Sequence, residues 1–343
     1  MLSADGRFIM RWRKIGFTHQ FRHGVHYYNL FLMPSKIAGL LGRRVWHAYE
    51  RWMLRLLYRK AFHQQGKPDV LYSHYLNVSY YALTLHHTYH IPHVVIEHWS
   101  ELNKPMLPHH VQWLGWQTYP QVDARITVSP SLQASLKKHF NVPSQVVYNI
   151  VGSEFHHNPS IQPPPQPVIF VSVGFLIERK RIDIALKAFA QLQSRPKTWQ
   201  YIVIGEGEKY QELNQLTQQL GIQEYVRFLG QQDKQSIANI LQRSHALILS
   251  SQLETFSVVC IEAMACGLPV IATKCGGPEH FVQPTDGLLC PINDVDAMAQ
   301  AISHMMEHHE EYDRKKIAED CQRRFGPQVI ARQLTQVFES VLR

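Results

Sequence analysis

Long hydrophobic runs are missing from this sequence. No segment reaches the roughly 18 consecutive apolar residues that a transmembrane helix requires. The first 14 residues place arginines on both sides of a very short apolar stretch, with no signal-peptide core and no small-residue cleavage site. These absences predict a cytoplasmic protein, with peripheral contact at the inner face of the membrane as an open alternative.

Cysteine is scarce and unevenly placed. Five cysteines occur, all in the second half and without a C-x-x-C pair: Cys260, Cys266, Cys275, Cys290 and Cys321. Their odd number and spacing argue against a disulfide framework and predict reduced thiols. Histidine is abundant, with 21 residues, but none joins a cysteine or carboxylate at a metal-ligand spacing. We therefore expect neither a metal nor a cofactor.

The composition is that of a folded globular protein. Of the 343 residues, 45% are hydrophobic and 18% are charged, and the length suffices for two domains. A proline-rich stretch at 159–167 cannot form a helix or a central strand and predicts a linker. The expected units are a domain over residues 1–155, a linker over 156–167, a domain over 168–325, and a final helix over 326–343 that packs on the first domain.

Short apolar strands alternate with helices after the linker. We expect strands at 168–173, 201–204, 226–229, 246–249 and 270–272, each followed by a helix. The first half follows the same plan less regularly, with strands at 69–73, 94–97 and 124–128 and helices at 44–64, 79–90 and 131–139. Apolar strands separated by helices are typical of a parallel sheet covered on both faces. The sequence thus predicts an α/β protein with two Rossmann-type doubly wound domains facing a cleft.

Basic residues give the chain a net charge of +8. Between residues 43 and 60 they alternate with aromatic and leucine residues at helical spacing. Such a helix can lie on an anionic membrane surface. The alternative is a surface helix whose arginines snorkel while it packs on its own domain. No recognition motif accompanies the charge, so nucleic-acid binding is not expected.

One segment combines a strand end, two glutamates and the start of a helix. Glu254 follows a strand that ends near Ser251, and Glu262 lies on a helix that begins near Ser257. The first-turn amides of that helix lack internal partners and carry a positive dipole, which suits a diphosphate. Eight helical residues separate the glutamates by about 12 Å. This span suits the two ends of a sugar-diphosphate-ribose ligand and is too wide for a glycosidase pair.

The same segment resembles a known family. E-x7-E followed by A-M-A-C-G-L-P-V-I-A at 263–272 is similar to the signature of retaining glycosyltransferases with the GT-B fold, of the group 1 or family 4 type. Four further stretches resemble motifs of that family in the same order, at 171–183, 202–207, 226–230 and 276–289. The resemblance covers essentially residues 168–300.

The resemblance implies a role for each motif residue. Glu254 would contact the transferred sugar, Glu262 the nucleotide ribose, and Lys180 the leaving diphosphate. The other donor-binding residues implied by position are glycines and loop residues: Gly174, Gly205, Gly207, Gly230, Thr255, Phe256, Ser257 and Val258. Phe175 stands where the family usually has a cation, and Arg179 is the candidate that replaces it.

The first half contributes histidines. By the resemblance, His98 would follow a strand and face the transferred sugar, with a buried core histidine as the alternative. His74 ends an earlier strand and is a second candidate at the cleft. Residues 1–42 lack the strand and glycine-rich loop with which family members open, so the resemblance implies an acceptor-side domain that is incomplete at its start.

Together these patterns predict a retaining glycosyltransferase. It would move a hexose from a UDP- or GDP-sugar to a glycan or lipid-linked acceptor, in cell-surface glycan or glycolipid biosynthesis. The C-terminal domain would hold the donor. The alternative is a non-catalytic nucleotide-sugar-binding fragment or pseudo-enzyme, because the glycine-rich loop is missing.

Overall fold

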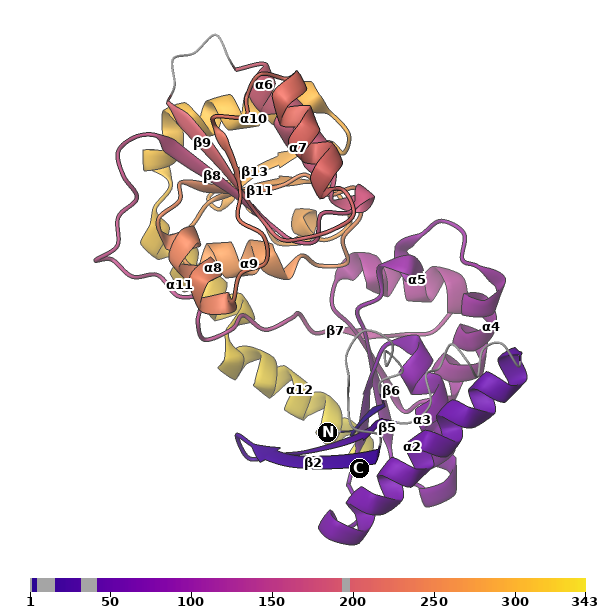
Figure 1. The fold of residues 1–343 in the computed structure, drawn as a ribbon. Helices are drawn as coiled ribbons and strands as arrows, with labels where there is room; N and C mark the ends of the chain where they lie inside the picture. Colours follow the sequence, from indigo (N-terminus) through magenta and orange to yellow (C-terminus); the bar gives the residue numbers. More distant parts are fainter. Residues whose placement is uncertain (1, 5–15, 32–41, 193–197) are drawn as a thin grey trace.

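The computed structural model describes residues 2–4, 16–31, 42–192 and 198–343. Figure 1 shows two α/β lobes, which we call the N-lobe and the C-lobe, joined by the proline-rich segment and by the last helix. No helix in these described ranges is long and apolar enough to cross a bilayer. All five cysteines are buried and unpaired.

The C-lobe is built on a parallel sheet. Among the described residues its strands run in the order β10-β9-β8-β11-β12-β13. Their bounds are β8 (Val168–Val173), β9 (Trp199–Ile204), β10 (Val226–Phe228), β11 (Ala246–Leu249), β12 (Val270–Thr273) and β13 (Gly287–Cys290). The sequence order reverses between β8 and β11, which makes this a doubly wound sheet. The predicted α/β class with parallel sheets is confirmed.

Helices cover both faces of this sheet. One face carries α6 (Ile182–Ala190), α7 (Tyr210–Gln219) and α10 (Val295–His308), and the other carries α8 (Lys234–Gln242), α9 (Val258–Ala265) and α11 (Arg314–Phe325) (Figure 1). Side chains alternate across a strand, so β8 serves two cores. Phe170 packs in the core under α6, whereas Val171 packs in the core that continues into the N-lobe.

The N-lobe has a second, smaller parallel sheet. Its strands, in spatial order, are β4 (Leu71–His74), β5 (His93–Glu97), β6 (Ala124–Thr127) and β7 (Gln145–Val146). The helices of this lobe are α2 (Arg43–Gln65), α3 (Leu76–Tyr89), α4 (His109–Thr118) and α5 (Pro130–Phe140). All residues of β5 are buried, as expected for a central strand with both faces covered.

A separate sheet precedes α2, and none of the sequence patterns above points to it. It consists of β1 (Leu2–Ala4), β2 (Gly16–Arg22) and β3 (Val25–Phe31) in the order β1-β3-β2. His23 and Gly24 form the hairpin turn with φ of 50° and 76°. Positive φ at both central residues matches the twist of paired strands. Tyr28 and Leu30 on β3 are buried against α2.

The last helix, α12 (Pro327–Leu342), runs from the C-lobe back to the N-lobe (Figure 1). Near its end the ring of Phe338 meets Tyr72 of β4 edge-on, with 5.1 Å between ring centroids. Ile330 and Val337 on the same helix are buried in the shared core. This helix therefore ties the two lobes together through apolar contacts.

Four aromatic rings, which we call the junction cluster, fill the space where the lobes meet: Tyr148, Phe256, Phe281 and Phe325. Tyr148 follows β7 in the N-lobe, and the other three belong to the C-lobe. Neighbouring ring centroids lie 5.0 to 5.6 Å apart, the separation at which aromatic pairs attract.

Removing one ring of the junction cluster should destabilise the fold. Phe325 is fully buried, so Phe325→Ala should lower the free energy of unfolding by about 3–5 kcal/mol. Phe175 is 73% exposed, and Phe175→Ala should change it by less than about 0.5 kcal/mol. Urea unfolding followed by circular dichroism measures both. Equal stability of the two variants would contradict the packing described here.

Candidate functional site

A lysine and a glutamate meet at the carboxyl ends of β8 and β11. The ammonium of Lys180 donates to Oε1 of Glu254 over 2.6 Å, and the Ser251 hydroxyl donates to the same oxygen over 2.8 Å. The two charged side chains are only 17% and 13% exposed. Both charges are therefore held in fixed positions, and the sequence alone did not indicate the contribution of Ser251.

Two glycines bring the ends of β8 and β9 into backbone contact. Gly174 has a φ of 156° and Gly205 a φ of 137°, which side chains rarely allow. A Cβ on Gly205 would come within 1.9 Å of the Gly174 carbonyl oxygen. Gly207 lies against the Leu176 carbonyl, and the Gly205 amide donates to the carbonyl of Gly230. The glycines picked out by the sequence motifs are thus gathered at one edge of the sheet.

The loop before α9 is fixed on both sides. The ring of Phe256 is buried in the junction cluster, so only its backbone can face a ligand. The hydroxyl of Thr255 donates to the backbone oxygen of His98 over 3.0 Å, which links the two lobes. Ser257 has a φ of 78° and precedes the first residue of α9, Val258. The helix begins one residue later than predicted, and its first amides have no partner inside the helix.

Glu262 lies further along α9, on the side of α8. Burial raises the pKa of Glu262 to about 7, with the positive charge of Lys234 lowering it and the negative charge of Glu154 raising it. The structure does not pair Glu262 with the Lys180–Glu254 ion pair. The two glutamates of the E-x7-E pattern therefore occupy different environments.

His98 and His74 lie side by side at the ends of β5 and β4. Nδ1 of His74 and Nε2 of His98 are 3.1 Å apart, and the two ring planes differ by 2°. Burial lowers the pKa of His98 to about 4 and also lowers that of His74. Both rings are therefore uncharged at neutral pH.

Arg179 reaches the other lobe. Its guanidinium donates to the Ser100 hydroxyl over 2.5 Å, and Ser100 begins a short 3-10 helix, η2 (Ser100–Asn103), after β5. Phe175 stands where the resembled family usually has a cation, and its side chain is largely exposed to solvent. A second contact between the lobes joins the Ser131 hydroxyl to the Gly276 carbonyl. Neither contact can be read from the sequence, because both depend on how the lobes are placed.

A carboxyl group is buried directly behind His98. Glu97 is fully buried, and neither of its oxygens has a hydrogen-bond partner of good geometry. Burial raises the pKa of Glu97 to about 8, against the opposing effect of Tyr119 and of the nearby backbone amides. The side chain is therefore largely protonated at neutral pH.

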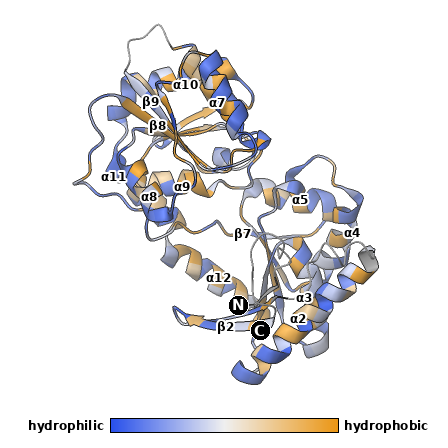
Figure 2. Cartoon of the chain, viewed as in Figure 1, coloured by the Kyte–Doolittle hydropathy of each residue, from blue (hydrophilic) through white to orange (hydrophobic). Residues whose placement is uncertain are grey.

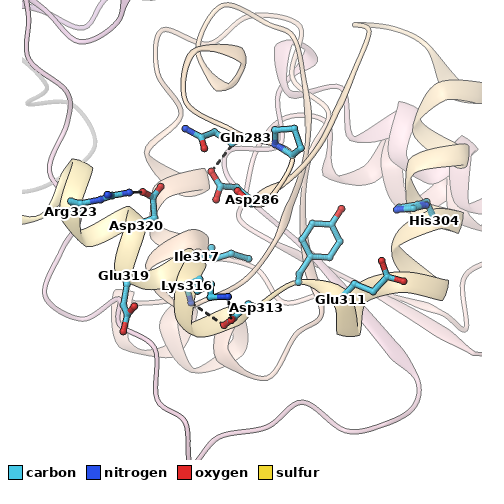
Figure 3. Close-up of a pocket in the computed structure, with 13 residues that line it drawn as sticks. Gln283, Asp286, His304, Glu311, Asp313, Lys316, Ile317, Glu319, Asp320 and Arg323 are labelled. Carbon is cyan, nitrogen blue, oxygen red and sulfur yellow. Dashed lines mark hydrogen bonds and ion pairs between the residues drawn. The ribbon is translucent and has the colours of Figure 1, made fainter.

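A large cavity lies elsewhere, on the C-lobe. It has a volume of about 850 Å³ and is lined by the 283–286 loop and by residues of α10 and α11 (Figure 3). Asp286 at its wall is already paired with Arg324 over 3.0 Å. None of the residues singled out by sequence lines it. The described residues also contain no group of three or more side chains suited to hold a metal.

Two family profiles match the chain. The profile described as "Glycosyl transferases group 1" matches residues 154–321, and "Glycosyltransferase Family 4" matches residues 15–155. Together they span the described core of both lobes.

Curated relatives match over part of their length. N-acetyl-alpha-D-glucosaminyl L-malate synthase of Bacillus anthracis is 29% identical over 51% of this chain and 46% of its own length. The putative colanic acid biosynthesis glycosyltransferase WcaL of Salmonella typhimurium is 26% identical over 66% of this chain and 58% of its own. The chain thus spans about half the length of these relatives.

Solved structures share the arrangement of both lobes. Sucrose-phosphate synthase of Thermosynechococcus elongatus superimposes with a TM-score of 0.79 at 20% identity, over 96% of this chain and 86% of that chain. HepE of Anabaena, solved with UDP, gives a TM-score of 0.72 at 20% identity, over 83% of this chain and 82% of that chain. At this identity the likeness shows the fold, which is GT-B-like.

The buried carboxyl of Glu97 should make stability depend on pH. Its pKa in the folded protein, about 8, exceeds the value of about 4.3 expected in the unfolded chain. The folded state therefore retains a proton that the unfolded state loses, and stability falls as pH rises from about 4.5 through 8. Glu97→Gln removes this loss, so its advantage over the unsubstituted protein should grow by about 3.5 kcal/mol between pH 5 and pH 8.

Chemical unfolding at pH 5 and pH 8 measures this difference. Glu319→Gln, on the exposed surface of α11, is the matched control and should show no such growth. Identical pH dependence of Glu97→Gln and the unsubstituted protein would contradict the uncharged state of Glu97.

Proposed function

The chain belongs to the glycosyltransferases of group 1 and family 4, and we propose that it transfers a hexose from a nucleotide-sugar donor to an acceptor hydroxyl, with retention at the anomeric carbon. The observation that carries this proposal is the Lys180–Glu254 ion pair at the strand ends, beside the amino end of α9 and across from His98. A UDP-sugar or GDP-sugar is the donor.

The C-lobe supplies the groups that such a donor needs. Lys180 and the first amides of α9 offer positive charge to a diphosphate. Gly174 leaves room for it, since a Cβ there would lie 3.4 Å from the Lys180 side chain. Glu254 would accept hydrogen bonds from the transferred sugar, and Glu262 from the ribose. This distribution matches the separate environments of the two glutamates.

The chemistry needs no protein nucleophile in this proposal. The bond between the anomeric carbon and the diphosphate oxygen breaks, and the acceptor oxygen bonds to the same face of that carbon. The acceptor proton passes to the departing phosphate oxygen. Negative charge grows on the diphosphate, and a fixed ammonium with aligned amides stabilises it without reorganisation. Lys180 is held in place for this by Glu254. No cofactor takes part.

The acceptor would meet the N-lobe. Colanic acid biosynthesis in the name of one relative suggests a cell-surface glycan or a lipid-linked glycan as the acceptor class. The rival proposal is a protein that binds nucleotide sugars without transferring them. Nucleotide binding without transfer to any acceptor would favour the rival.

The donor site can be tested by calorimetric titration with UDP, GDP and ADP. We expect one nucleotide to bind saturably and Glu262→Ala to weaken it by about tenfold, since a buried hydrogen bond to the ribose is lost. Glu224→Ala is the matched control, because Glu224 is exposed before β10, at the edge of the sheet away from the site.

Two results would contradict the donor site. One is the absence of binding by any nucleotide to a folded sample. The other is equal weakening by Glu262→Ala and Glu224→Ala, which would place the nucleotide elsewhere.

We also propose that α2 contacts an anionic membrane. Residues 1–65 hold 12 of the 35 lysines and arginines but only 2 of the 27 acidic residues, so the rest of the chain carries no net positive charge. Figure 2 shows hydrophobic and hydrophilic residues interleaved along α2. One exposed stripe of this helix, at spacings of three, four and seven, carries Val45, Trp52, Arg55, Arg59 and Phe62.

Arg51 behaves differently from its neighbours. It donates to the Tyr80 hydroxyl and to the His47 carbonyl, over 3.2 and 3.3 Å, and so takes part in the packing of the lobe. The arginines of the stripe, in contrast, are exposed. Alternating arginines and large apolar residues suit the boundary between lipid headgroups and acyl chains.

Co-sedimentation with phosphatidylglycerol vesicles at low salt tests the membrane contact. The double variant Arg55→Gln, Arg59→Gln should bind about 30-fold more weakly, at roughly 1 kcal/mol for each lost charge. The double variant Lys315→Gln, Lys316→Gln removes two exposed charges of α11 and should bind as the unsubstituted protein does. Absence of binding by the unsubstituted protein, or equal loss in both variants, would sink the proposal.

A further inference from the structure

The structure assigns a role to His74 that the proposed donor site does not include. We propose that His74 is a positioning residue, whose Nδ1 atom hydrogen-bonds to Nε2 of His98 and holds that ring in one orientation between the lobes. The consequence for transfer rests on the proposed function. The consequence for His98 itself does not.

Strand pairing brings the two histidines together. His74 is the last residue of β4, and it pairs in register with Ile96 of β5. His98 follows the end of β5 by one residue. Parallel strands end at the same edge of a sheet, so both imidazoles emerge there. The two rings are nearly parallel, and the facing nitrogens lie at hydrogen-bond distance, 3.1 Å.

A hydrogen bond between two imidazole nitrogens requires one proton between them. One nitrogen must donate and the other must accept, so the bond cannot form when both carry protons. The bond also couples the tautomers of the two rings, since a neutral His98 carries its proton on Nδ1 when His74 donates and on Nε2 when His74 accepts. His74 therefore limits the facing nitrogens to one proton and links the proton position of His98 to its own.

Other groups around His98 are uncharged or hold the ring from other sides. The ring of Tyr75 lies 5.3 Å away at the start of α3, and Asn149, after β7, hydrogen-bonds to the imidazole and raises its pKa. Glu97, the residue before His98, is largely protonated at neutral pH. The Thr255 hydroxyl of the C-lobe donates to the backbone oxygen of His98. Glu254, next to Thr255, is neutralised by Lys180. The titratable neighbour that touches the His98 ring nitrogen is thus His74.

The remaining nitrogen of His74 allows a clear separation of roles. The His74 side chain is partly exposed, and the bond to His98 uses only its Nδ1. An asparagine can place its amide near the position of Nδ1, whereas a glutamine reaches the position of Nε2. His74→Asn should therefore preserve a contact made through Nδ1, and His74→Gln should not. His74→Phe keeps a ring and removes both nitrogens.

The first experiment is nitrogen NMR of the histidine rings in the free protein, without substrate. The His98 signals are identified by their loss in His98→Gln. At pH 7.5 we expect the His98 nitrogen signals of His74→Asn to match those of the unsubstituted protein, and those of His74→Phe and His74→Gln to shift, because the bond to Nε2 is lost. In His74→Phe, the pKa of His98 should rise, because the electrostatic effect of His74, which lowers it, is removed.

The second experiment is transfer kinetics of the same variants. His74→Phe and His74→Gln should lower kcat about tenfold, the loss of one hydrogen bond, with nucleotide affinity unchanged. The acid limb of the rate profile should move to higher pH in His74→Phe. His74→Asn should keep most of the activity.

The outcomes distinguish this proposal from the proposed function. Unchanged His98 signals in His74→Phe would overturn it, whatever the transferase activity. Activity kept by His74→Gln and lost by His74→Asn would also overturn it, since His74 would then act through Nε2. If no transfer is found at all, the NMR result alone still decides the role of His74.

Discussion

Burial of Phe256 between the lobes is the constraint on which the site depends. Its ring lies 5.5 Å from Tyr148 of the N-lobe and 5.6 Å from Phe325 at the end of α11. Glu254 and Thr255 precede this anchored residue, and their side chains bond to Lys180 and to the His98 backbone. The packing of the Phe256 ring thus helps to hold the charged Glu254 side chain and the Thr255–His98 contact between the lobes in place.

The two sides of the site differ in charge. On the C-lobe side, an ammonium and a carboxylate are held at the strand ends, near the first turn of α9. On the N-lobe side, His74 and His98 are uncharged, and Glu97, the residue before His98, is protonated. The two fixed charges of the site, on Lys180 and Glu254, therefore both lie in the C-lobe, which holds the diphosphate in the proposed function. The opposite wall leaves a sugar or an acceptor hydroxyl in neutral surroundings, where it meets hydrogen-bonding groups without a competing charge.

Sequence patterns predict the C-lobe well because its strands are buried on both faces. The strand expected at 246–249 is β11 to the residue, and α9 differs from its predicted start by one. The β2–β3 hairpin was not predicted because most residues of β2 are exposed and give no apolar pattern, although His23-Gly24 is a turn signal. The Arg179–Ser100 contact could not be predicted, since 79 residues separate the partners and only lobe packing joins them. The His74–His98 bond requires the order of β4 and β5, which local sequence does not contain.

Arg179, the candidate cation for the diphosphate, contacts the N-lobe through Ser100. Phe175 takes the position where the family pattern has a cation, and it is 73% exposed. Arg179 donates to Ser100 through Nη1 in this arrangement of the lobes, so the residue that could replace that cation also contacts the N-lobe. Lys180, next to it, is the cation that the strand ends do hold, and Glu254 keeps it there. Adjacent residues thus make different contacts, Arg179 with the N-lobe and Lys180 with Glu254. Separation of the lobes would release Arg179 without moving Lys180, because the partners of Lys180 all lie in the C-lobe.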